Sequence, residues 1–383
     1  MELLSRAVSA DNRLIGSSRF DSIFALPHFA TLWGGKTFFY VEIRDTNAGI
    51  DTVTPVKVSK VPPNLTVALC PSPPQIIDGP NGVSNWREVL KALLLFLKES
   101  YKCVAVTVNQ KPPNPQFVRG KVDGCKLSYG YDVMIELSDE LRTIYHNMDK
   151  RHRYTLRKSS GRSDVELSSA DWLENTGFTI RQGTSEESLQ EFNALWRESM
   201  CRIYERMSYM GKLFFTDNLS LNTLVTRFRK LYPYGLFKLF TIYNKDYRPG
   251  ASAIFYTSNN LTAVPMVYWT EIASSEDANK KGLPTLLLWY SIQWFKKHGF
   301  RRYYMGGYYP RDPNIGHSLY KRGFGGQTVS GLSLLWLTQP IGTVYNIASS
   351  FTQPLTPMHL PLMELTDRLR AKLLGSARLS SSV

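Results

Sequence analysis

The sequence is poor in cysteine and histidine, which narrows the chemistry open to it. Of its 383 residues, four are Cys and six are His. No two cysteines form a Cys-x-x-Cys pair, and no histidine lies at metal-ligand spacing from a cysteine. The sequence therefore predicts neither a disulfide framework nor a zinc site, and we expect no metal cofactor. This cysteine usage is typical of a reducing compartment.

Long apolar runs are also missing. The most apolar windows, near residues 93–97 and 283–295, are too short or too often interrupted by lysine to span a bilayer. Residues 1–16 lack the hydrophobic core of a signal peptide. We therefore expect a cytoplasmic protein without stable membrane insertion.

Acidic side chains are outnumbered by basic ones. The chain has 46 Lys and Arg against 32 Asp and Glu, a formal net charge of +14. Such a charge suits nucleic acid, an anionic membrane surface or a phosphate-bearing small molecule, but it also occurs in proteins with no specific acidic partner. The length and the 43% hydrophobic content predict two domains, each with its own core.

The second half of the chain carries the clearer periodic pattern. A capping box, Thr184-x-x-Glu187, precedes an amphipathic helix, and a second helix is predicted at residues 219–231. Three strand-like runs separated by turn residues then predict an antiparallel meander. A strongly apolar helix, a strand, a short helix and a final strand follow. These runs cover residues 236–243, 251–257, 261–270, 283–299, 301–305, 315–320 and 327–337.

The first half repeats part of this order. Three strands, an amphipathic helix and another strand are predicted, at residues 36–43, 54–60, 65–69, 86–97 and 101–108. A strand at residues 132–137 and one long helix over residues 138–158 lead into the second half. The order of elements is that of the acyl-CoA N-acyltransferase (GNAT) fold. We thus expect an α+β protein of two tandem GNAT-like subdomains, each a mixed, mostly antiparallel sheet flanked by helices.

Domain boundaries follow from this pattern. They predict an N-terminal GNAT-like subdomain with the basic connecting helix, a C-terminal subdomain that binds the acyl donor, and an extension. These cover residues 1–160, 161–338 and 339–383. The extension contains one amphipathic helix at residues 362–374, which packs on the body, joins a partner or rests on an anionic membrane.

Two motifs carry a family resemblance. A basic run of the form K-x-x-R-x-x-[IL]-R-K ends the long helix, and a Gly-Gly pair is followed by a Tyr-Lys-x-x-Phe-Gly signature. The residues are Lys150, Arg153, Leu156, Arg157, Lys158, Gly306, Gly307, Tyr320, Lys321, Phe324 and Gly325. Over about residues 20–337 the chain resembles the Fem-type (FemAB-like) peptidyltransferases and the BioF-associated acetyltransferase-like group. This resemblance implies that the second subdomain handles the acyl donor.

The resemblance leaves two donors open. The family includes enzymes of peptidoglycan-bridge synthesis that take aminoacyl groups from tRNA, and members that look like acyl-CoA users. The long antiparallel coiled-coil arm of some tRNA-using members has no counterpart in this sequence. We therefore expect acyl-CoA as the co-substrate, with aminoacyl-tRNA as the alternative.

The donor-binding turn of a GNAT fold lies between its fourth strand and the next helix, where backbone N–H groups at a helix N-terminus face the pyrophosphate. The usual motif is Q/R-x-x-G-x-G/A. The matching residues are Asn279, Lys280, Lys281, Gly282, Leu283 and Pro284. Asn and Pro depart from the motif, and the two lysines offer compensating charge. The alternative is an ordinary capped turn. Gly306 and Gly307 complete the predicted donor site.

Three side chains are candidates for catalysis. Lys321 suits a donor phosphate or the oxyanion of an acyl-transfer intermediate, unless it only ends a helix on the surface. Tyr320 suits protonation of a departing thiolate, or core packing. Glu271 is the candidate base for the attacking amine, with Asp312 or a water relay as rivals.

Basic and aromatic side chains are candidates for substrate binding. The densest basic cluster comprises Arg151, Arg153, Arg157 and Lys158, which suit a phosphate of a nucleotide-linked acceptor or an RNA backbone, unless they form only an exposed helix end. The aromatic cluster comprises Tyr303, Tyr304, Tyr308 and Tyr309. We assign Tyr304 and Tyr308 to a pocket wall, although strand alternation would place half of the cluster in the core.

Three functions remain at this point. The first is an N-acyltransferase that passes an acyl group from acyl-CoA to a primary amine by direct attack, because no Ser–His–Asp or Cys–His arrangement is apparent. The second is a Fem-type aminoacyltransferase that uses aminoacyl-tRNA. The third is a non-enzymatic nucleic-acid-binding protein, although no helix-turn-helix, zinc-finger or RNA-recognition signature is present.

Overall fold

Two units make up the described part of the chain in the computed structural model. The described residues are 4–8, 23–30, 32, 38–45, 50–61, 64–72, 74–78, 86–110, 125–168, 176–206, 219–244, 246–258, 261–262, 264–308 and 316–338. One unit comprises the described parts of Met1–Gly130 and Ser330–Val383, and the other those of Tyr131–Val329. The predicted helix at residues 362–374 lies outside the described residues, as do Tyr309 and Asp312.

The first unit is a mixed sheet with the strand order β1-β2-β3-β4-β6-β13, and β5 pairs with β3. Its ladders are antiparallel except for β4–β6, which are parallel and joined through α3. The apolar face of α3 packs on this sheet. The bounds are β1 (Leu4–Val8), η1 (Ile23–Ala25), α2 (Pro27–Ala30), β2 (Phe38–Asp45), β3 (Ile50–Val61), β4 (Leu65–Cys70), β5 (Gln75–Asp78), α3 (Trp86–Tyr101), β6 (Cys103–Gln110) and β13 (Gln327–Leu337).

The second unit has the strand order β7-β12-β11-β10-β9-β8, again with one parallel ladder, β11–β12, joined through a helix, α11. The strands are β7 (Cys125–Glu136), β8 (Thr179–Gln182), β9 (Phe237–Tyr243), β10 (Pro249–Thr257), β11 (Met266–Ser274) and β12 (Arg302–Tyr308). Each unit thus contains a meander, a crossover helix and a parallel strand. The predicted α+β fold with two tandem GNAT-like subdomains is confirmed.

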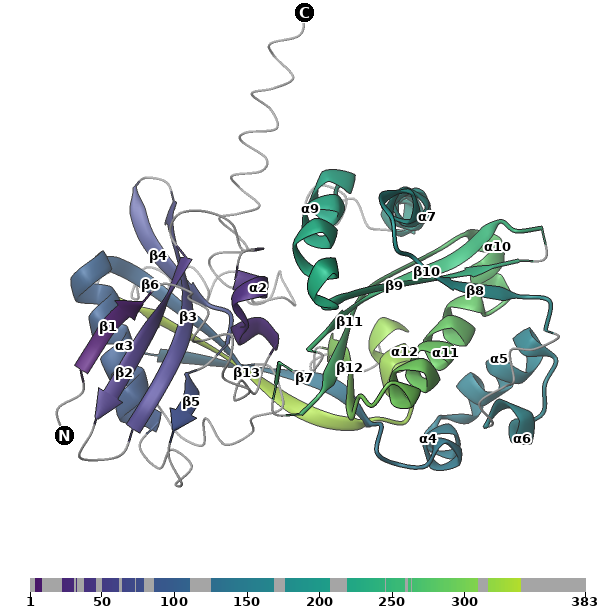
Figure 1. Cartoon of the computed structure of the whole chain (residues 1–383), viewed down its shortest axis with the longest axis horizontal. Helices are drawn as coiled ribbons and strands as arrows, with labels where there is room; N and C mark the ends of the chain where they lie inside the picture. Colours follow the sequence, from purple (N-terminus) through teal and green to yellow (C-terminus); the bar gives the residue numbers. More distant parts are fainter. Residues whose placement is uncertain are drawn as a thin grey trace, which may run out of the picture. The chain divides into compact units, whose positions relative to one another are not determined.

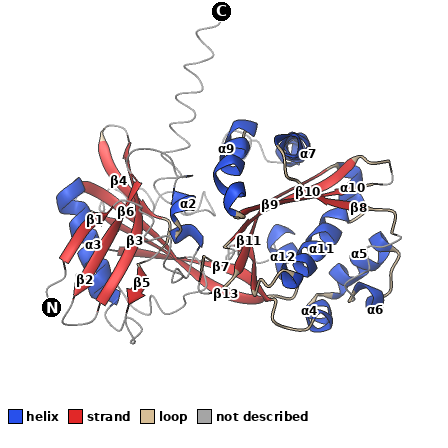
Figure 2. Ribbon diagram, in the orientation of Figure 1, coloured by secondary structure: helices blue, strands red, loops and turns tan. Residues whose placement is uncertain are grey.

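Helices cover both faces of the second sheet. On one face lie α7 and α9, and on the other lie α11 and α12, with α4 to α6 beyond them (Figures 1 and 2). Their bounds are α4 (Leu141–Asn147), α5 (Lys150–Ser160), α6 (Asp164–Leu167), α7 (Glu186–Arg206), α9 (Leu221–Leu231), η4 (Tyr232–Tyr234), α10 (Glu276–Lys280), α11 (Leu283–Lys297) and α12 (Gly316–Arg322). None of the described helices is long and apolar enough to cross a membrane.

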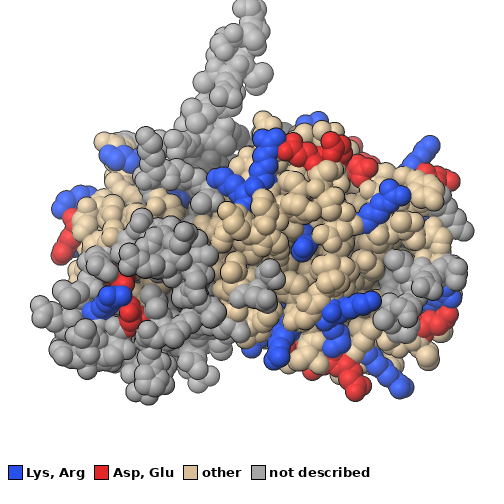
Figure 3. Space-filling view, viewed as in Figure 1, with Lys and Arg blue, Asp and Glu red and all other residues tan. Residues whose placement is uncertain are grey.

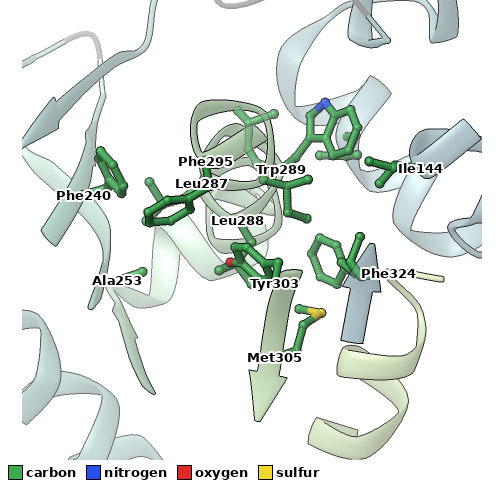
Figure 4. Packing of buried hydrophobic residues seen from close by; sticks show 14 of the residues in the cluster. Ile144, Phe240, Ala253, Leu287, Leu288, Trp289, Phe295, Tyr303, Met305 and Phe324 are labelled. Carbon is green, nitrogen blue, oxygen red and sulfur yellow. The ribbon is translucent and has the colours of Figure 1, made fainter. Parts of the chain in front are cut away.

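The core of the second unit surrounds α11. Leu287, Trp289 and Phe295 of this helix pack among side chains from the sheet and from α4, as well as Phe324 beyond α12 (Figure 4). Trp289 is buried, and its indole Nε1 donates to the Leu167 carbonyl at 3.0 Å. This packing explains why the sequence of α11 is apolar on more than one side, and it fixes α12 beside the sheet.

The long helix predicted over residues 138–158 is two helices. The break falls before Asp149, whose extended backbone and side chain cap α5 by accepting from the His152 N–H at 2.6 Å. The basic run therefore forms a helix of its own, which ends at Gly161 in a left-handed conformation. Helix α5 packs against α11 and lies in the second unit, which begins at Tyr131. The sequence had predicted that this basic helix would end the N-terminal subdomain at residue 160.

Candidate active site

Strands β11 and β12 part shortly after they begin to pair. Their ladder in the described chain joins Met266–Tyr268 to Arg302–Tyr304, although β11 continues to Ser274 and β12 to Tyr308. Both strands shift register on their outer sides at this point, since β11 carries a bulge opposite β10 and β12 shifts against β7. In the first unit β4 stays paired with β6 from Thr66 to its last residue. We call the parting of β11 and β12 the split.

Lys321 reaches the split from the last turn of α12. A Cβ built on Gly306 would lie 3.2 Å from Lys321 Nζ and 3.6 Å from the Trp269 carbonyl oxygen. The same ammonium lies 5.4 Å from the centroid of the Trp269 ring. Gly306 has φ +78°, a backbone conformation that favours glycine. A cation, a backbone carbonyl and a residue without a side chain therefore converge where the two strands separate.

Tyr320 connects this point to the start of α11. Its hydroxyl lies 3.3 Å from Thr285 Oγ1 in the first turn of α11. Its ring packs against the rings of His152 and Phe324. Burial raises the pKa of the Tyr320 hydroxyl far above its ordinary value of 10. The hydroxyl therefore keeps its proton through the neutral range, so it can donate a hydrogen bond or, as a weak acid, give its proton to a strongly basic leaving group.

Glu271 lies on the opposite face of the sheet from Lys321. It pairs across the ladder with Ile254, next to Phe255, which belongs to the core on the α11 side, so Ile254 and Glu271 point toward α7 and α9. Its Oε1 accepts from Arg227 Nη1 of α9 at 2.9 Å. Its Oε2 is buried and has no hydrogen-bond partner among the described residues. The carboxylate is thus held by one cation with its second oxygen available.

The predicted donor turn is packed under the basic helix. Gly282, with φ +75°, caps α11, and a Cβ there would lie 2.4 Å from Thr155 Cγ2 and 2.6 Å from Ser159 Oγ. Ser159 Oγ also donates to the Lys281 carbonyl at 2.5 Å. Glycine at this position is therefore required both by its backbone conformation and by the close approach of α5.

The backbone of this turn has few N–H groups to offer. The amides of Asn279, Lys281, Gly282 and Thr285 all donate to nearby backbone carbonyls. Pro284 has no N–H. The side chains of the two turn lysines pair with Glu276 and Asp277 of α10, each at 2.7 Å. A pyrophosphate site at a helix N-terminus depends on N–H groups directed at the anion, and most of those here are already engaged.

The four cations predicted to bind substrate fall into two pairs. Arg157 Nη1 donates to both carboxylate oxygens of Asp164, at 2.8 and 2.9 Å, and Arg153 donates to a backbone carbonyl at 3.3 Å. Arg151 and Lys158 are exposed, and Tyr154 between them is 56% exposed. The first pair supports the local structure, and the second presents charge to solvent.

Replacing Asp164 by asparagine is expected to lower stability in a pH-dependent manner. Hydrogen bonds from the Tyr145 hydroxyl and from Arg157 hold the pKa of Asp164 below its usual range. A carboxyl group with a lowered folded-state pKa stabilises the protein above its unfolded pKa of about 3.9 and loses that contribution as pH falls through the folded value. Because the pair is partly exposed, we expect the variant to lose up to about 1 kcal/mol at pH 7.

Urea unfolding of Asp164→Asn beside the parent protein at pH 7 and pH 2.5 measures this effect. The stability difference should shrink at the lower pH. A difference that stays constant across this range would contradict the assigned ion pair.

The two motifs of the family resemblance are one packed unit. The backbone N–H of Asp149 donates to the Gly323 carbonyl at 2.9 Å, and its side chain lies 2.7 Å from His152 Nδ1. The buried His152 ring lies 4.8 Å from the Phe324 ring, and a Cβ on Gly323 would lie 2.1 Å from His152 Cε1. The start of α5 therefore fixes the segment after α12, and with it Lys321. The sequence singled out neither Asp149 nor His152, although Asp149 is a typical capping residue.

The aromatic residues of β12 alternate between the two faces of the sheet. Tyr303 is buried in the core on the α11 side, and Tyr304 is buried on the other face, where it stacks on Tyr268 with centroids 4.5 Å apart. Gly307 pairs with Asp132 of β7. Tyr308 ends the strand, and its side chain lies outside the described residues.

No protein-family model and no curated protein matches the sequence. Solved structures do match. FemX is 14% identical, with a TM-score of 0.62, and the match covers 90% of this chain and 99% of FemX. L-PGS from Bacillus licheniformis is 16% identical, with a TM-score of 0.51 and coverage of 89% and 97%.

A tandem GNAT protein from the clavulanic acid biosynthesis pathway is 9% identical, with a TM-score of 0.50 and coverage of 88% and 99%. At these identities the likeness is one of fold. It extends over nearly the whole length of both chains. The protein therefore shares its fold with FemX, with L-PGS and with this tandem GNAT protein, as the resemblance to Fem-type proteins predicted.

Proposed function

We propose that this protein is an acyltransferase in which a primary amine attacks the carbonyl carbon of an activated acyl donor at the split. The observation that carries the proposal is the convergence of Lys321 Nζ, Gly306 and the Trp269 backbone where β11 and β12 separate. The first unit lacks such a parting between β4 and β6, which favours the second unit as the site of reaction.

The split suits a donor that carries an extended chain with amide groups. From Trp269 onward β11 has no ladder partner on its β12 side in the described chain, and at its end side chains of α7 bond the backbone of Ser274, so the stretch between Trp269 and Ser274 lies beside no paired strand there. An extended chain that enters beside a strand can bond to its backbone N–H and C=O groups. Gly306 leaves room for the acyl group beside Lys321, because any side chain there would approach the ammonium.

Lys321 and Tyr320 would act on the donor. As the amine adds, the carbonyl oxygen gains negative charge, which a nearby ammonium stabilises. Tyr320, protonated at neutral pH, would give its proton to the departing oxygen or sulfur. The only buried histidine beside them, among the described residues, packs against the Tyr320 and Phe324 rings rather than against a serine or cysteine, which favours direct attack without an acyl-enzyme.

Glu271 would act on the acceptor. Since its carboxylate points to the α7 and α9 face, the amine would approach the split from that face, opposite Lys321. The oxygen without a partner would accept the proton that the amine loses when the new bond forms. Arg227 would hold the carboxylate in place. The acceptor remains a small-molecule amine or a nucleotide-linked amine.

The turn before α11 favours aminoacyl-tRNA over acyl-CoA as the donor. Its amides are mostly engaged and α5 covers Gly282, so a CoA pyrophosphate would find few N–H groups. Exposed Arg151 and Lys158 offer cations for a nucleic-acid backbone instead. On the face drawn in Figure 3, basic side chains are interspersed with acidic ones, which gives the +14 charge no single focus there.

A donor-hydrolysis assay tests the proposal without knowledge of the acceptor, because water can replace the amine. The protein is incubated with labelled acetyl-CoA and, separately, with bulk tRNA charged with labelled amino acids. We expect slow release of label from aminoacyl-tRNA, lost in Lys321→Ala, and tRNA binding that weakens at least about tenfold between 50 and 200 mM salt. Release of label from acetyl-CoA and not from aminoacyl-tRNA would show that acyl-CoA is the donor. Release from neither donor would overturn the proposed function.

A further inference from the structure

The indole N–H of Trp269 has no hydrogen-bond acceptor in the described chain. Its indole Nε1 is buried and has no acceptor within hydrogen-bond distance there. An indole nitrogen is a donor only and cannot be satisfied by another donor. Burying it without an acceptor costs stability, and such groups are uncommon in folded proteins. By contrast, Trp289 Nε1 in the same core donates to a backbone carbonyl at 3.0 Å. The group on Trp269 therefore requires a specific explanation.

The position of Trp269 supplies one. It is the first residue of β11 beyond the ladder with β12, next to Tyr268, the last paired residue. Its ring packs against the core on the α11 side, 6.3 Å from the Tyr320 ring, and Lys321 Nζ lies over it. A buried neutral donor and a cation thus adjoin each other at the split.

We propose that the Trp269 indole N–H is a second hydrogen-bond donor, beside Lys321, for the carbonyl oxygen of the acyl group. This inference rests on the proposed function and adds a catalytic residue to it. An ester or thioester carbonyl oxygen accepts two hydrogen bonds, and one neutral donor with one cation matches the single negative charge that it gains. The ammonium on the ring face also draws electron density from the indole, which strengthens its N–H as a donor.

The reaction balances without proton transfer at Trp269. The amine nitrogen forms a bond to the carbonyl carbon, and the bond from that carbon to the leaving oxygen or sulfur breaks. The amine's proton goes to Glu271, and the leaving group takes a proton from Tyr320. The indole keeps its hydrogen throughout and only donates to the oxygen while that atom is charged. Removing the N–H should therefore slow the chemical step more than it weakens donor binding.

A substitution that removes only the N–H tests this role. Trp269 is replaced by 3-benzothienylalanine, in which sulfur takes the place of the indole N–H, and turnover is measured by donor hydrolysis with whichever of acetyl-CoA and aminoacyl-tRNA the parent protein uses. We expect kcat to fall about 10- to 100-fold with KM changed less than about threefold, because one donor of two is lost. Since the removed group has no partner in the described chain, the midpoint of thermal unfolding should not fall.

Trp294→Phe is the matched control. This tryptophan lies on the far end of α11, where it stacks on His298, and its loss should leave kcat unchanged. A kcat within twofold of the parent for the benzothienylalanine variant would overturn the role of Trp269 and leave the proposed function intact. Absence of turnover by the parent protein would overturn the proposed function and this inference with it.

Discussion

Lys321→Ala is expected to lower kcat for donor turnover by about 10²- to 10³-fold, the range for removal of one group that stabilises an oxyanion. The ammonium lies at the split, 5.4 Å from the Trp269 ring centroid and next to Gly306. Without it, the charge that develops on the carbonyl oxygen loses its only proposed cationic partner. The measurement is single-turnover hydrolysis of a saturating labelled donor.

Two further variants separate charge from general disruption. Lys297→Ala removes an exposed lysine from the last turn of α11 and should leave kcat unchanged. Lys321→Arg keeps the charge but spreads it over a planar group, so it should recover only part of the lost activity. If Lys321→Ala retained turnover within about threefold of the parent, Lys321 would have no part in the chemical step.

Gly325→Ala is expected to destabilise the protein by about 3 kcal/mol or more. Gly325 has φ +76°, which costs a residue with a Cβ about 1–2 kcal/mol. A Cβ there would also lie 2.1 Å from the Asn147 carbonyl oxygen and 2.8 Å from the Met148 nitrogen, and these are backbone atoms that cannot turn aside. Forced overpacking adds about 1–3 kcal/mol. Denaturant unfolding measures the loss.

Gly161→Ala measures the cost of the left-handed backbone conformation alone, without a steric clash. Gly161 has φ +69°, and nothing lies within 4 Å of a Cβ built on it. This variant should lose only about 1–2 kcal/mol. Equal losses for the two variants would mean that the contact between the segment after α12 and the end of α4 contributes nothing, and that this contact does not hold Lys321 in place.

Periodicity and turn chemistry were sufficient to predict the meanders and the apolar crossover helices. The apolar faces of α3 and α11 and the turn residues of the β9–β10 meander each predicted an element that the structure contains. The Tyr-Lys-x-x-Phe-Gly signature predicted a functional role for Lys321, the side chain that reaches the split. Each of these features depends on residues close together in the chain, so the sequence alone could predict it.

Features that depend on distant contacts could not be predicted. Ser159 and Lys281, 122 residues apart, bring α5 onto the donor turn, and no local pattern indicates that contact. The face on which Glu271 lies depends on the bulge in β11, because one extra residue reverses the alternation of side chains. The end of the β11–β12 ladder at Tyr268 likewise depends on strands that are far apart in the sequence, so neither the split nor its unpartnered indole had a sequence signal.

The central claim is that acyl transfer takes place at the split. The most direct test is a crystal structure with two unreactive donor mimics in turn, a 2-oxopropyl thioether of CoA and an amide-linked aminoacyl adenosine that represents the end of charged tRNA. We predict that one of them binds with its carbonyl oxygen within hydrogen-bond distance of Lys321 Nζ, between β11 and β12. A mimic held elsewhere, with its carbonyl out of reach of Lys321, would contradict the claim.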